Sequence, residues 1–478
     1  MKHLLILSGV IAVLAILARG TIMPGPYTYD EADYAYAASL GWPANALDTP
    51  SMSLSDFVKT GLGRGRDAGA KRELSDTIRN SGDVLFYRHW HGPGYSDWLS
   101  LMRHLTSNER FARMSNYSFP IAAAILMYFT TLWLLPGPAG RIAAILSSVL
   151  YLWSYPVVRS TELGPHQFFA ACVALALLLL AKTATSPERS ARRYWYAAVF
   201  ATGVAFCLLE VCFALILTML FCGYALRTRL QPDLGFAVRS VGLFVVTVLI
   251  IWPGAVLKLS FIKAYLFMAY LAVFRGNAWG PGATIAGTWW LRFVQSPVPW
   301  ILAAIGAVWF IKARPRAAVL LPFLVFTLTM SAAIFPVKTA MARYTLPLWP
   351  GLVLFAALSA GLALANWKPA VRLAATGFIL AAMLAASWPS LRAGLPPANS
   401  RCDRVLALIR DHGLATKTLL VPHEDVPMLH YYFQGSHFQQ YYDATDIREQ
   451  IRNAGIDGVI DRGDPPRFIP ASAMAKPE

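Results

Sequence analysis

The chain has 478 residues, of which 56% are hydrophobic and only 14% are charged, and its mean hydropathy is +0.47. A soluble globule of this length cannot bury so much apolar surface, so the composition excludes a soluble enzyme and indicates a membrane protein. The formal net charge of +16 would suggest a nucleic-acid partner in a soluble protein. Here the basic residues follow a membrane topology instead, and we expect no nucleic acid as a partner.

Apolar segments recur along most of the chain. A hydrocarbon core about 30 Å thick demands roughly 17 to 25 apolar residues for each spanning helix, and about eleven segments approach that length. They predict an α-helical polytopic membrane protein. The stretch 194–226 predicts either one long helix or two short helices broken near Glu210. The predicted segments are 4–18, 117–135, 141–157, 166–181, 194–209, 211–226, 240–256, 298–312, 317–335, 344–365 and 371–388.

Basic residues gather in four short loops between these segments. If the N-terminus starts inside, all four loops fall on the inner side, as the positive-inside rule requires. These inner loops are 182–193, 227–239, 312–316 and 368–372. The outer parts are then 19–116, 257–297, 336–343 and the tail after about 389. We therefore expect a multi-pass protein of the cytoplasmic (inner) membrane, with its N-terminus inside, its C-terminal end outside and its chemistry on the outer face.

The large first outer loop, 19–116, carries an acidic pair soon after the first apolar segment. The residues Tyr29-Asp30-Glu31 follow Pro26 and predict the start of a helix with acids in its first turn. Acids at this position can simply complement the helix dipole. They also stand at the lipid–water boundary, where a transferase that uses a lipid-linked donor would place a general base.

Two further motifs lie on the same outer side. The run 91–95 (His-Gly-Pro-Gly-Tyr) precedes the second apolar segment, and the run 343–350 (Arg-Tyr-Thr-Leu-Pro-Leu-Trp-Pro) enters a late one. Together with Asp30-Glu31, these runs resemble the GT-C superfamily of membrane glycosyltransferases, especially the branch of protein O-mannosyltransferases and lipid A aminoarabinose transferases. The His-Pro-Pro-Leu-Tyr run of that family has Gly here in place of its first Pro and of its Leu. The resemblance covers residues 1–390 and implies a transmembrane catalytic domain.

The resemblance also implies roles for these residues. Asp30 is the expected general base for the acceptor hydroxyl, with Glu31 beside it as the second catalytic residue. The donor is expected to be a polyprenyl-phosphate sugar, whose leaving phosphate needs cations or imidazoles near the membrane surface. Residues 87–91 are basic and aromatic, and they could instead form a belt that anchors the chain at the membrane interface. The predicted phosphate-binding residues are Arg343, His91, Arg88 and His89.

A carboxylate inside an apolar stretch is costly, so Glu210 is predicted to face a cavity or a partner. A helix break at the outer surface would explain it equally well. The GT-C family often has a Lys in this region, and Glu210 would replace that basic group. The residues predicted to line the substrate cavity are Tyr29, Tyr95, Tyr344 and Glu210.

No cofactor and no metal is predicted. Members of the family differ in their need for a divalent cation, but adjacent helical carboxylates point about 100° apart and chelate one ion poorly. Four of the five cysteines lie inside apolar segments and Cys402 stands alone, which predicts neither a disulfide framework nor a zinc site. The glycine-rich stretch 61–72 lacks the preceding strand and the Gly-Lys-Ser/Thr ending of a nucleotide-binding loop.

The two remaining outer parts also have predicted structure. The loop 257–297 mixes basic residues with aromatic and aliphatic ones, which predicts an amphipathic helix lying in the membrane interface. Residues 391–478 are predicted to form a small α/β extracytoplasmic domain with a parallel sheet, for acceptor recognition or for capping the catalytic cavity. Its predicted helices are 401–411, 424–433 and 445–454, and its predicted strands are 417–421 and 456–460.

The sequence thus predicts a glycosyltransferase that moves one sugar from a polyprenyl-phosphate donor to a glycan, lipid or protein acceptor on the outer face. Its partners would be the donor, the acceptor and membrane lipids. A transporter or flippase of lipid-linked sugars is an alternative, which internal repeats with broken helices in both halves would favour. A polysaccharide ligase that uses a polyprenyl pyrophosphate is another, and it would need more cations for the second phosphate.

Overall fold

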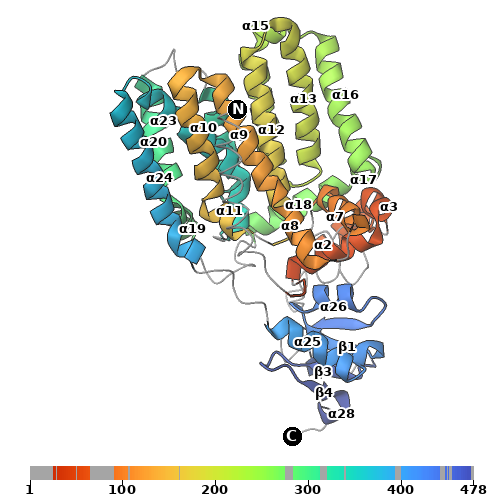
Figure 1. The fold of residues 1–478 in the computed structure, drawn as a ribbon. Coiled ribbons are helices and arrows are strands. Elements are labelled where there is room, and N and C mark those ends of the chain that lie inside the picture. Colours follow the sequence, from red (N-terminus) through yellow and green to blue (C-terminus); the bar gives the residue numbers. More distant parts are fainter. Residues whose placement is uncertain are drawn as a thin grey trace.

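The computed structural model describes residues 25–27, 29–49, 51–64, 91–105, 108–160, 162–274, 284–312, 320–338, 341–392, 400–441, 447–448, 450–451 and 455–474. The predicted first helix, 4–18, and the predicted phosphate-binding residues Arg88 and His89 lie outside them. The described chain forms a bundle of long helices with a small α/β domain at one end (Figure 1). The predicted fold class, a helical membrane protein with a small C-terminal α/β domain, is confirmed.

The helices of the bundle coincide with the predicted apolar segments. Inside lipid, a backbone can satisfy its own polar groups only as a helix or a closed barrel, so apolar stretches of this length become helices. The bundle consists of α9 (Ser118–Leu134), α10 (Gly137–Leu152), α12 (Pro165–Thr185), α13 (Glu188–Phe206), α14 (Cys212–Ala225), α16 (Leu234–Ile251), α20 (Pro297–Lys312), α21 (Leu321–Ile334), α23 (Trp349–Leu364) and α24 (Pro369–Arg392).

The number of spans is smaller than predicted when helix length is applied strictly. Among the described residues, six helices are long and apolar enough to cross a membrane. A seventh is counted if α19 (Ile285–Gln295) and α20, which meet at a bend of 101°, form one broken span. Helices α14 and α21 are apolar but shorter. The figure of eleven therefore stays a prediction.

The stretch 194–226 forms two helices rather than one. Helix α13 ends at Phe206 and α14 begins at Cys212, so that Glu210 lies in the break between them. The backbone carbonyl of Cys207 accepts a hydrogen bond from the N–H of Gly94 at 3.0 Å. The break is thus occupied by a loop from the first outer region, which brings that loop close to Glu210.

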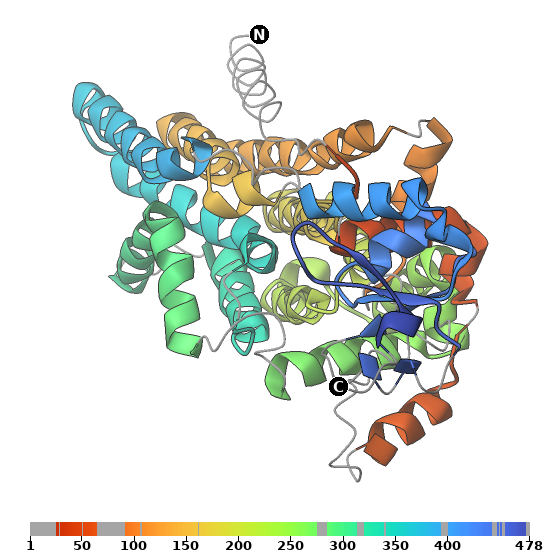
Figure 2. The same ribbon diagram turned by 90° about the horizontal axis from the view of Figure 1, so that it is seen from below.

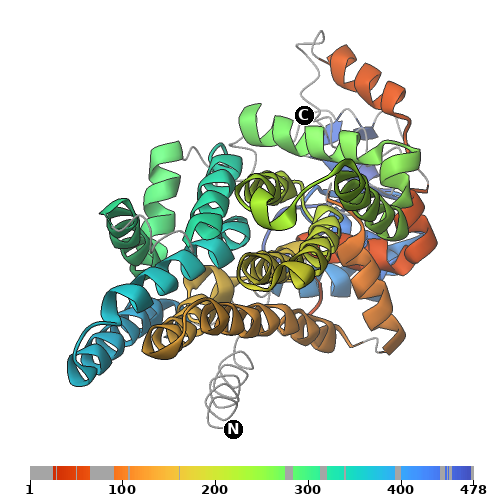
Figure 3. The ribbon, with the colours of Figure 1, turned by 90° about the horizontal axis from the view of Figure 1, so that it is seen from above.

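Short helices gather at the end of the bundle nearer the α/β domain. Figure 3 shows several bundle helices nearly end-on while the green helix α18 runs across them. Two helices fall in the predicted interface segment 257–297: α18 is mostly apolar, whereas α19 (Ile285–Gln295) has one face that is more polar, as an amphipathic helix requires. The short helices here are α2 (Tyr29–Leu40), α3 (Trp42–Leu47), α4 (Leu54–Arg64), α7 (Gly94–Leu105), α8 (Glu109–Asn116), α11 (Tyr155–Arg159), α17 (Pro253–Leu257), α18 (Ser260–Phe274), α22 (Ala342–Thr345) and η2 (Leu346–Leu348).

One predicted basic loop lies at the other end of the bundle. Helix α15 (Arg227–Leu230) is at the end opposite to the α/β domain (Figure 1). There the Arg192 guanidinium donates to the carbonyls of Leu230 and Gln231 at 2.9 and 2.6 Å. The basic loop and the α/β domain therefore lie on opposite sides, as the topology requires, while the assignment of the inner side stays a prediction.

The C-terminal domain contains a four-stranded sheet of order β2-β1-β3-β4. The two predicted strands, β1 and β3, pair in parallel as expected, and β1 also pairs in parallel with β2. Strand β4 pairs with β3 in antiparallel fashion, so the sheet as a whole is mixed. The sequence pattern located β1 and β3 and missed β2 and β4. The elements are α25 (Ser400–Asp411), η3 (Leu414–Thr416), β1 (Leu419–Pro422), α26 (Val426–Tyr432), β2 (Phe438–Tyr441), β3 (Gly458–Ile460), β4 (Phe468–Pro470) and α28 (Ala471–Met474).

Candidate active site

The acidic pair opens helix α2, as predicted, with both carboxylates in the first turn. Successive helical residues point about 100° apart, so the two side chains reach different partners. Asp30 forms an ion pair with Arg343, whereas Glu31 pairs with Arg113. The two carboxylates therefore have separate surroundings although they are neighbours in the chain.

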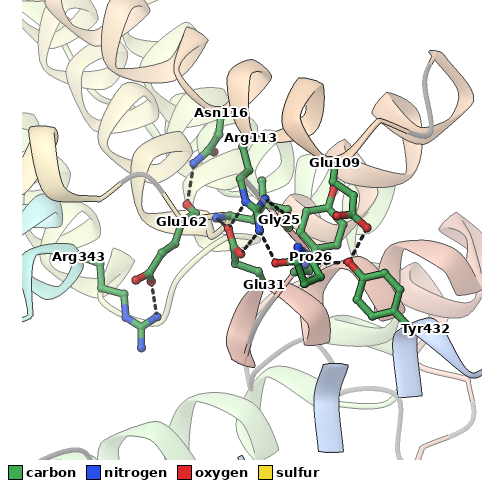
Figure 4. A network of polar contacts seen from close by, with 11 residues as sticks. Gly25, Pro26, Glu31, Glu109, Arg113, Asn116, Glu162, Arg343 and Tyr432 are labelled. Carbon is green, nitrogen blue, oxygen red and sulfur yellow. Dashed lines mark hydrogen bonds and ion pairs between the residues drawn. The ribbon is translucent and has the colours of Figure 1, made fainter. Parts of the chain in front are cut away.

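Glu31 is deeply buried, with only 3% of its side chain exposed. Its Oε1 accepts hydrogen bonds from Arg113 Nε at 2.9 Å and from the Leu163 N–H at 3.0 Å, and its Oε2 accepts from a terminal Arg113 nitrogen at 2.6 Å. Arg113 also donates to the carbonyls of Gly25 and Pro26 at 2.8 and 2.9 Å. Figure 4 shows this guanidinium between Glu31 and the chain that leads into α2. The buried pair thus fixes the start of α2 against α8.

Asp30 lies in a more open position, since 19% of its side chain and 19% of that of Arg343 are exposed. The same guanidinium contacts the carboxylate of Glu162 at 3.2 Å, as Figure 4 also shows. The backbone carbonyl of Glu162 accepts from the Asn116 amide at 3.0 Å. Arg343, from the late part of the membrane region, is therefore shared by two carboxylates from the first half of the chain.

A cavity with about 510 Å³ of empty volume opens beside this cluster. Its polar wall brings together imidazoles, a guanidinium and phenols from four distant segments of the chain. A second cavity, with about 450 Å³ of empty volume, shares His166, Met268 and Tyr344 with the first and is otherwise mostly apolar. The first is lined by Tyr34, His91, Ser160, Glu162, Leu163, Gly164, His166, Gln167, Met268, Arg343 and Tyr344. The second adds Leu209, Glu210, Val211, Ile334, Val337 and Pro347.

His91 pairs with Glu210 across the two cavities, since its Nδ1 lies 2.8 Å from a carboxylate oxygen. Glycines explain how the two approach, because a Cβ at Gly92 would lie 2.3 Å from the carbonyl oxygen of Cys207. The absence of a side chain at Gly92 therefore lets this loop pack into the break after α13. The ring of His166 lies 5.9 Å from that of His91, which puts two imidazoles in one wall.

Two buried phenols complete the surroundings. Burial raises the pKa of Tyr34 well above its ordinary value, and the nearby Asp30 raises it further. Burial likewise raises the pKa of Tyr95, whose hydroxyl donates to Asn116 at 3.3 Å. Tyr34 therefore presents a neutral hydroxyl to the cavity, while Tyr95 lies behind it, in edge-to-face contact at 5.3 Å.

The structure brings together most of the predicted site residues. Asp30, Arg343, His91, Tyr344 and Glu210 lie in or against the two cavities. The backbone of Tyr29 begins α2, but its side chain lies outside the described part of the chain. Sequence reasoning missed three residues with direct contacts to this group. These are Arg113, Glu162 and His166.

A metal site was not predicted. Within the described ranges, no group of three or more His, Cys, Asp or Glu side chains is arranged to hold a metal ion. Two carboxylates of the site, those of Asp30 and Glu162, both contact the guanidinium of Arg343.

Comparison with known proteins gives matches in structure alone: no model of a known family matches the chain, and no curated protein matches it in sequence. ArnT from Cupriavidus metallidurans in the apo state matches with a TM-score of 0.57 at 13% identity, over 95% of this chain and 91% of ArnT. The apo oligosaccharyltransferase from Archaeoglobus fulgidus matches with a TM-score of 0.58 at 10% identity, over 95% of this chain and 69% of that enzyme. Both are GT-C glycosyltransferases, and the chain has the GT-C fold.

Proposed function

We propose that this protein is a membrane glycosyltransferase that moves a sugar from a polyprenyl-phosphate donor to an acceptor hydroxyl on the outer face of the membrane. The observation that carries this proposal is the pairing of Asp30 with Arg343 beside a cavity lined by His91 and His166. The fold supports it, since the archaeal oligosaccharyltransferase AglB, in complex with an inhibitory peptide and a dolichol-phosphate, matches with a TM-score of 0.55 at 11% identity, over 92% of this chain and 64% of that enzyme. The acceptor is a glycan, a lipid or a protein.

In the proposed reaction, Asp30 is the general base. Its carboxylate takes the proton from the acceptor hydroxyl while the acceptor oxygen forms a bond to the anomeric carbon of the sugar. The bond from that carbon to the phosphate oxygen breaks, and its electron pair leaves with the polyprenyl phosphate. Glu31 contributes indirectly, because its two oxygens hold Arg113 and Leu163 and thereby fix the helix that carries Asp30.

The leaving phosphate is stabilised by Arg343 and the two imidazoles. The Nε–H of Arg343 is buried, and no acceptor within the described part of the chain forms a hydrogen bond with it. This edge of the guanidinium can bind a phosphate oxygen while its terminal nitrogen holds Asp30. The contact of His91 Nδ1 with the Glu210 carboxylate, at 2.8 Å, fixes the orientation of this imidazole in the wall of the cavity.

The second cavity suits the lipid end of the donor. Six of its nine lining residues are apolar, including Leu209, Val211 and Ile334. It adjoins the first cavity through His166 and Tyr344, so a phosphate between the two would have its polyprenyl chain on the apolar side and its sugar on the polar side. This arrangement favours a polyprenyl-phosphate donor over a water-soluble sugar nucleotide.

The test is mass spectrometry of envelope glycolipids, glycans and surface proteins from cells that lack the protein, rescued at matched expression. Wild type is expected to restore one missing sugar, and Asp30→Asn is expected to leave it missing. The matched control is Asp56→Asn, an exposed carboxylate on α4 in the same outer region, which should rescue fully. Full rescue by Asp30→Asn would remove Asp30 as the base and favour a transporter. Loss of a whole polymer in the deletion strain would favour a polysaccharide ligase.

A further inference from the structure

The C-terminal domain contacts the helix that carries the proposed base. Figure 2 shows the domain beneath one half of the bundle, on the side of α2 and away from α24. Helix α26 packs on α2, and the rings of Tyr431 and Tyr27 meet edge to face with 5.4 Å between their centroids. On α2 itself, Tyr36 lies 6.2 Å from the ring of His430. The helix that presents Asp30 therefore rests partly on a domain outside the bundle.

The hydroxyl group of Tyr432 links this domain both to the chain that enters α2 and to helix α8, which holds the first turn of α2. The oxygen of the Tyr432 hydroxyl accepts the N–H of Tyr27 at 2.8 Å, and its O–H donates to the carboxylate of Glu109. Figure 4 shows the hydroxyl between Glu109 and the start of α2. Glu109 begins α8, and Arg113 one turn later in the same helix holds Glu31. Tyr432 thus contacts the chain that enters α2 and the helix that anchors its first turn.

Further contacts follow α2 toward its other end. The guanidinium of Arg103, from α7, donates to the carbonyl of Ala35 at 3.3 Å and to the Tyr431 hydroxyl at 3.2 Å. It also lies over the Tyr431 ring, 5.5 Å from its centroid. Near the end of α2, the Gln434 amide donates to the Ser39 hydroxyl at 3.2 Å. Contacts from the domain therefore reach the start, the middle and the end of the helix.

A helix of 12 residues such as α2 is marginal by itself, so its position comes from tertiary contacts. A general base must lie within hydrogen-bonding distance of the proton it takes, and a misplacement of about 1 Å can cost about 10²-fold in rate. Part of the surface that fixes α2 belongs to the C-terminal domain. A domain devoted to acceptor recognition alone would have no need of contacts along the whole helix.

Building on the proposed transferase function, we infer that the C-terminal domain positions α2 for catalysis and that Tyr432 is a positioning residue. Tyr432 acts through Tyr27 and Glu109 rather than by touching substrate. Without its hydroxyl, the start of α2 loses its link to the domain, and Asp30 is held less firmly. The site is therefore complete only when the C-terminal domain is docked.

The experiment compares the full-length wild type with Tyr432→Phe in lipid nanodiscs. Hydrogen exchange of peptides covering α2 is measured, together with binding of undecaprenyl phosphate and formation of the envelope product in cells. Tyr432→Phe is expected to speed exchange in α2, leave exchange in α12 unchanged, keep undecaprenyl phosphate affinity within about twofold and lower product formation roughly tenfold. The matched control is Tyr441→Phe, which removes a hydroxyl that donates to Ile460 at 2.9 Å within the domain; α2 and product should then stay as in wild type.

Unchanged exchange in α2 with Tyr432→Phe would overturn the inference, and so would faster exchange with a wild-type level of product. Gln434→Ala, at an exposed contact with the far end of α2, is a second variant in case Tyr432→Phe is poorly expressed. It should speed exchange around Ser39, and unchanged exchange there would count against the inference. Hydrogen exchange does not depend on turnover, so it tests the positioning role separately from the transferase function. If the wild type forms no product while hydrogen exchange in α2 still differs between Tyr432→Phe and Tyr441→Phe, only the transferase function is refuted.

Discussion

Replacing Glu31 by Gln removes the negative charge from a nearly fully buried ion pair. Glu31 and Arg113 are only 3% and 1% exposed, so water cannot replace the lost carboxylate. In the variant, the side-chain oxygen of the glutamine can take the place of Oε1 and accept from Arg113 and Leu163. The amide nitrogen of the glutamine then takes the place of Oε2 and faces another N–H of Arg113, so that two donors meet. Removing one partner from such a buried pair costs about 3–5 kcal/mol, because the other charge stays buried without compensation. Glu31→Gln should therefore lower the free energy of unfolding by about that amount.

The neighbouring carboxylate should behave differently. In Asp30→Asn, Arg343 keeps Glu162 at 3.2 Å, and both members of the lost pair are partly exposed, so we expect a cost near 1 kcal/mol. The change in the free energy of unfolding of each variant is measured by reversible unfolding of the purified protein in mixed detergent micelles titrated with SDS. Product formation by the same variants is measured in parallel. Asp30→Asn should lose product at nearly wild-type stability, whereas Glu31→Gln should lose stability first. Equal stability of the two variants would contradict the assignment of Asp30 as the base and Glu31 as the residue that anchors α2.

Three further predictions concern the binding of undecaprenyl phosphate, measured by titration of the purified protein. Glu210→Gln should weaken it roughly tenfold, because His91 loses the carboxylate that holds its ring in place. Gly92→Ala should weaken it and also lower the thermal midpoint, because the new methyl group would lie 2.3 Å from the carbonyl oxygen of Cys207. Glu162→Gln should instead strengthen it several-fold, because one of the two carboxylates that share a guanidinium loses its charge.

Each of these variants has a matched control. Glu188→Gln changes an exposed carboxylate at the start of α13 and should leave affinity unchanged. Gly242→Ala adds a methyl group in α16 where no atom lies within 4 Å, so it should not lower the thermal midpoint. Weaker binding by Glu162→Gln would contradict the competition between this carboxylate and phosphate. Wild-type affinity in Glu210→Gln would contradict a role for His91 in holding phosphate.

The helices of the bundle could be predicted from the sequence because lipid imposes one local solution on a long apolar stretch. The C-terminal sheet was harder to predict. Strand β2 (Phe438–Tyr441) contains two glutamines, and β4 (Phe468–Pro470) has three residues and ends in proline, so neither shows a strand pattern. Both are formed by pairing with β1 and β3. Their existence depends on neighbours that sequence periodicity does not identify.

Some residues of the candidate site could likewise be predicted from the sequence, and others could not. Asp30, Arg343 and His91 could be expected at one site because each lies in a short motif on the same predicted side of the membrane. Glu162 lies in the loop before α12 and His166 in the first turn of α12, and a Glu-Leu-Gly-Pro-His run has no meaning until α10 and α12 bring it against Arg343. The signal in the sequence was the presence of two ionisable residues next to the start of an apolar segment. Partners for buried charges are long-range choices, and a single sequence does not specify them.

The way these charges are held bears on the choice between an enzyme and a transporter. A transporter must open its site alternately to both sides, usually by rocking one part of the bundle against another around the site. Here Arg113 ties α2 to α8 through a buried ion pair, and Arg343 ties α2 to the loop before α12 through partly exposed ones. Alternating access would have to break these ion pairs in every cycle, and the buried one alone costs about 3–5 kcal/mol to break. A transferase instead gains from keeping them, since preorganised charges need no rearrangement when the sugar–phosphate bond breaks.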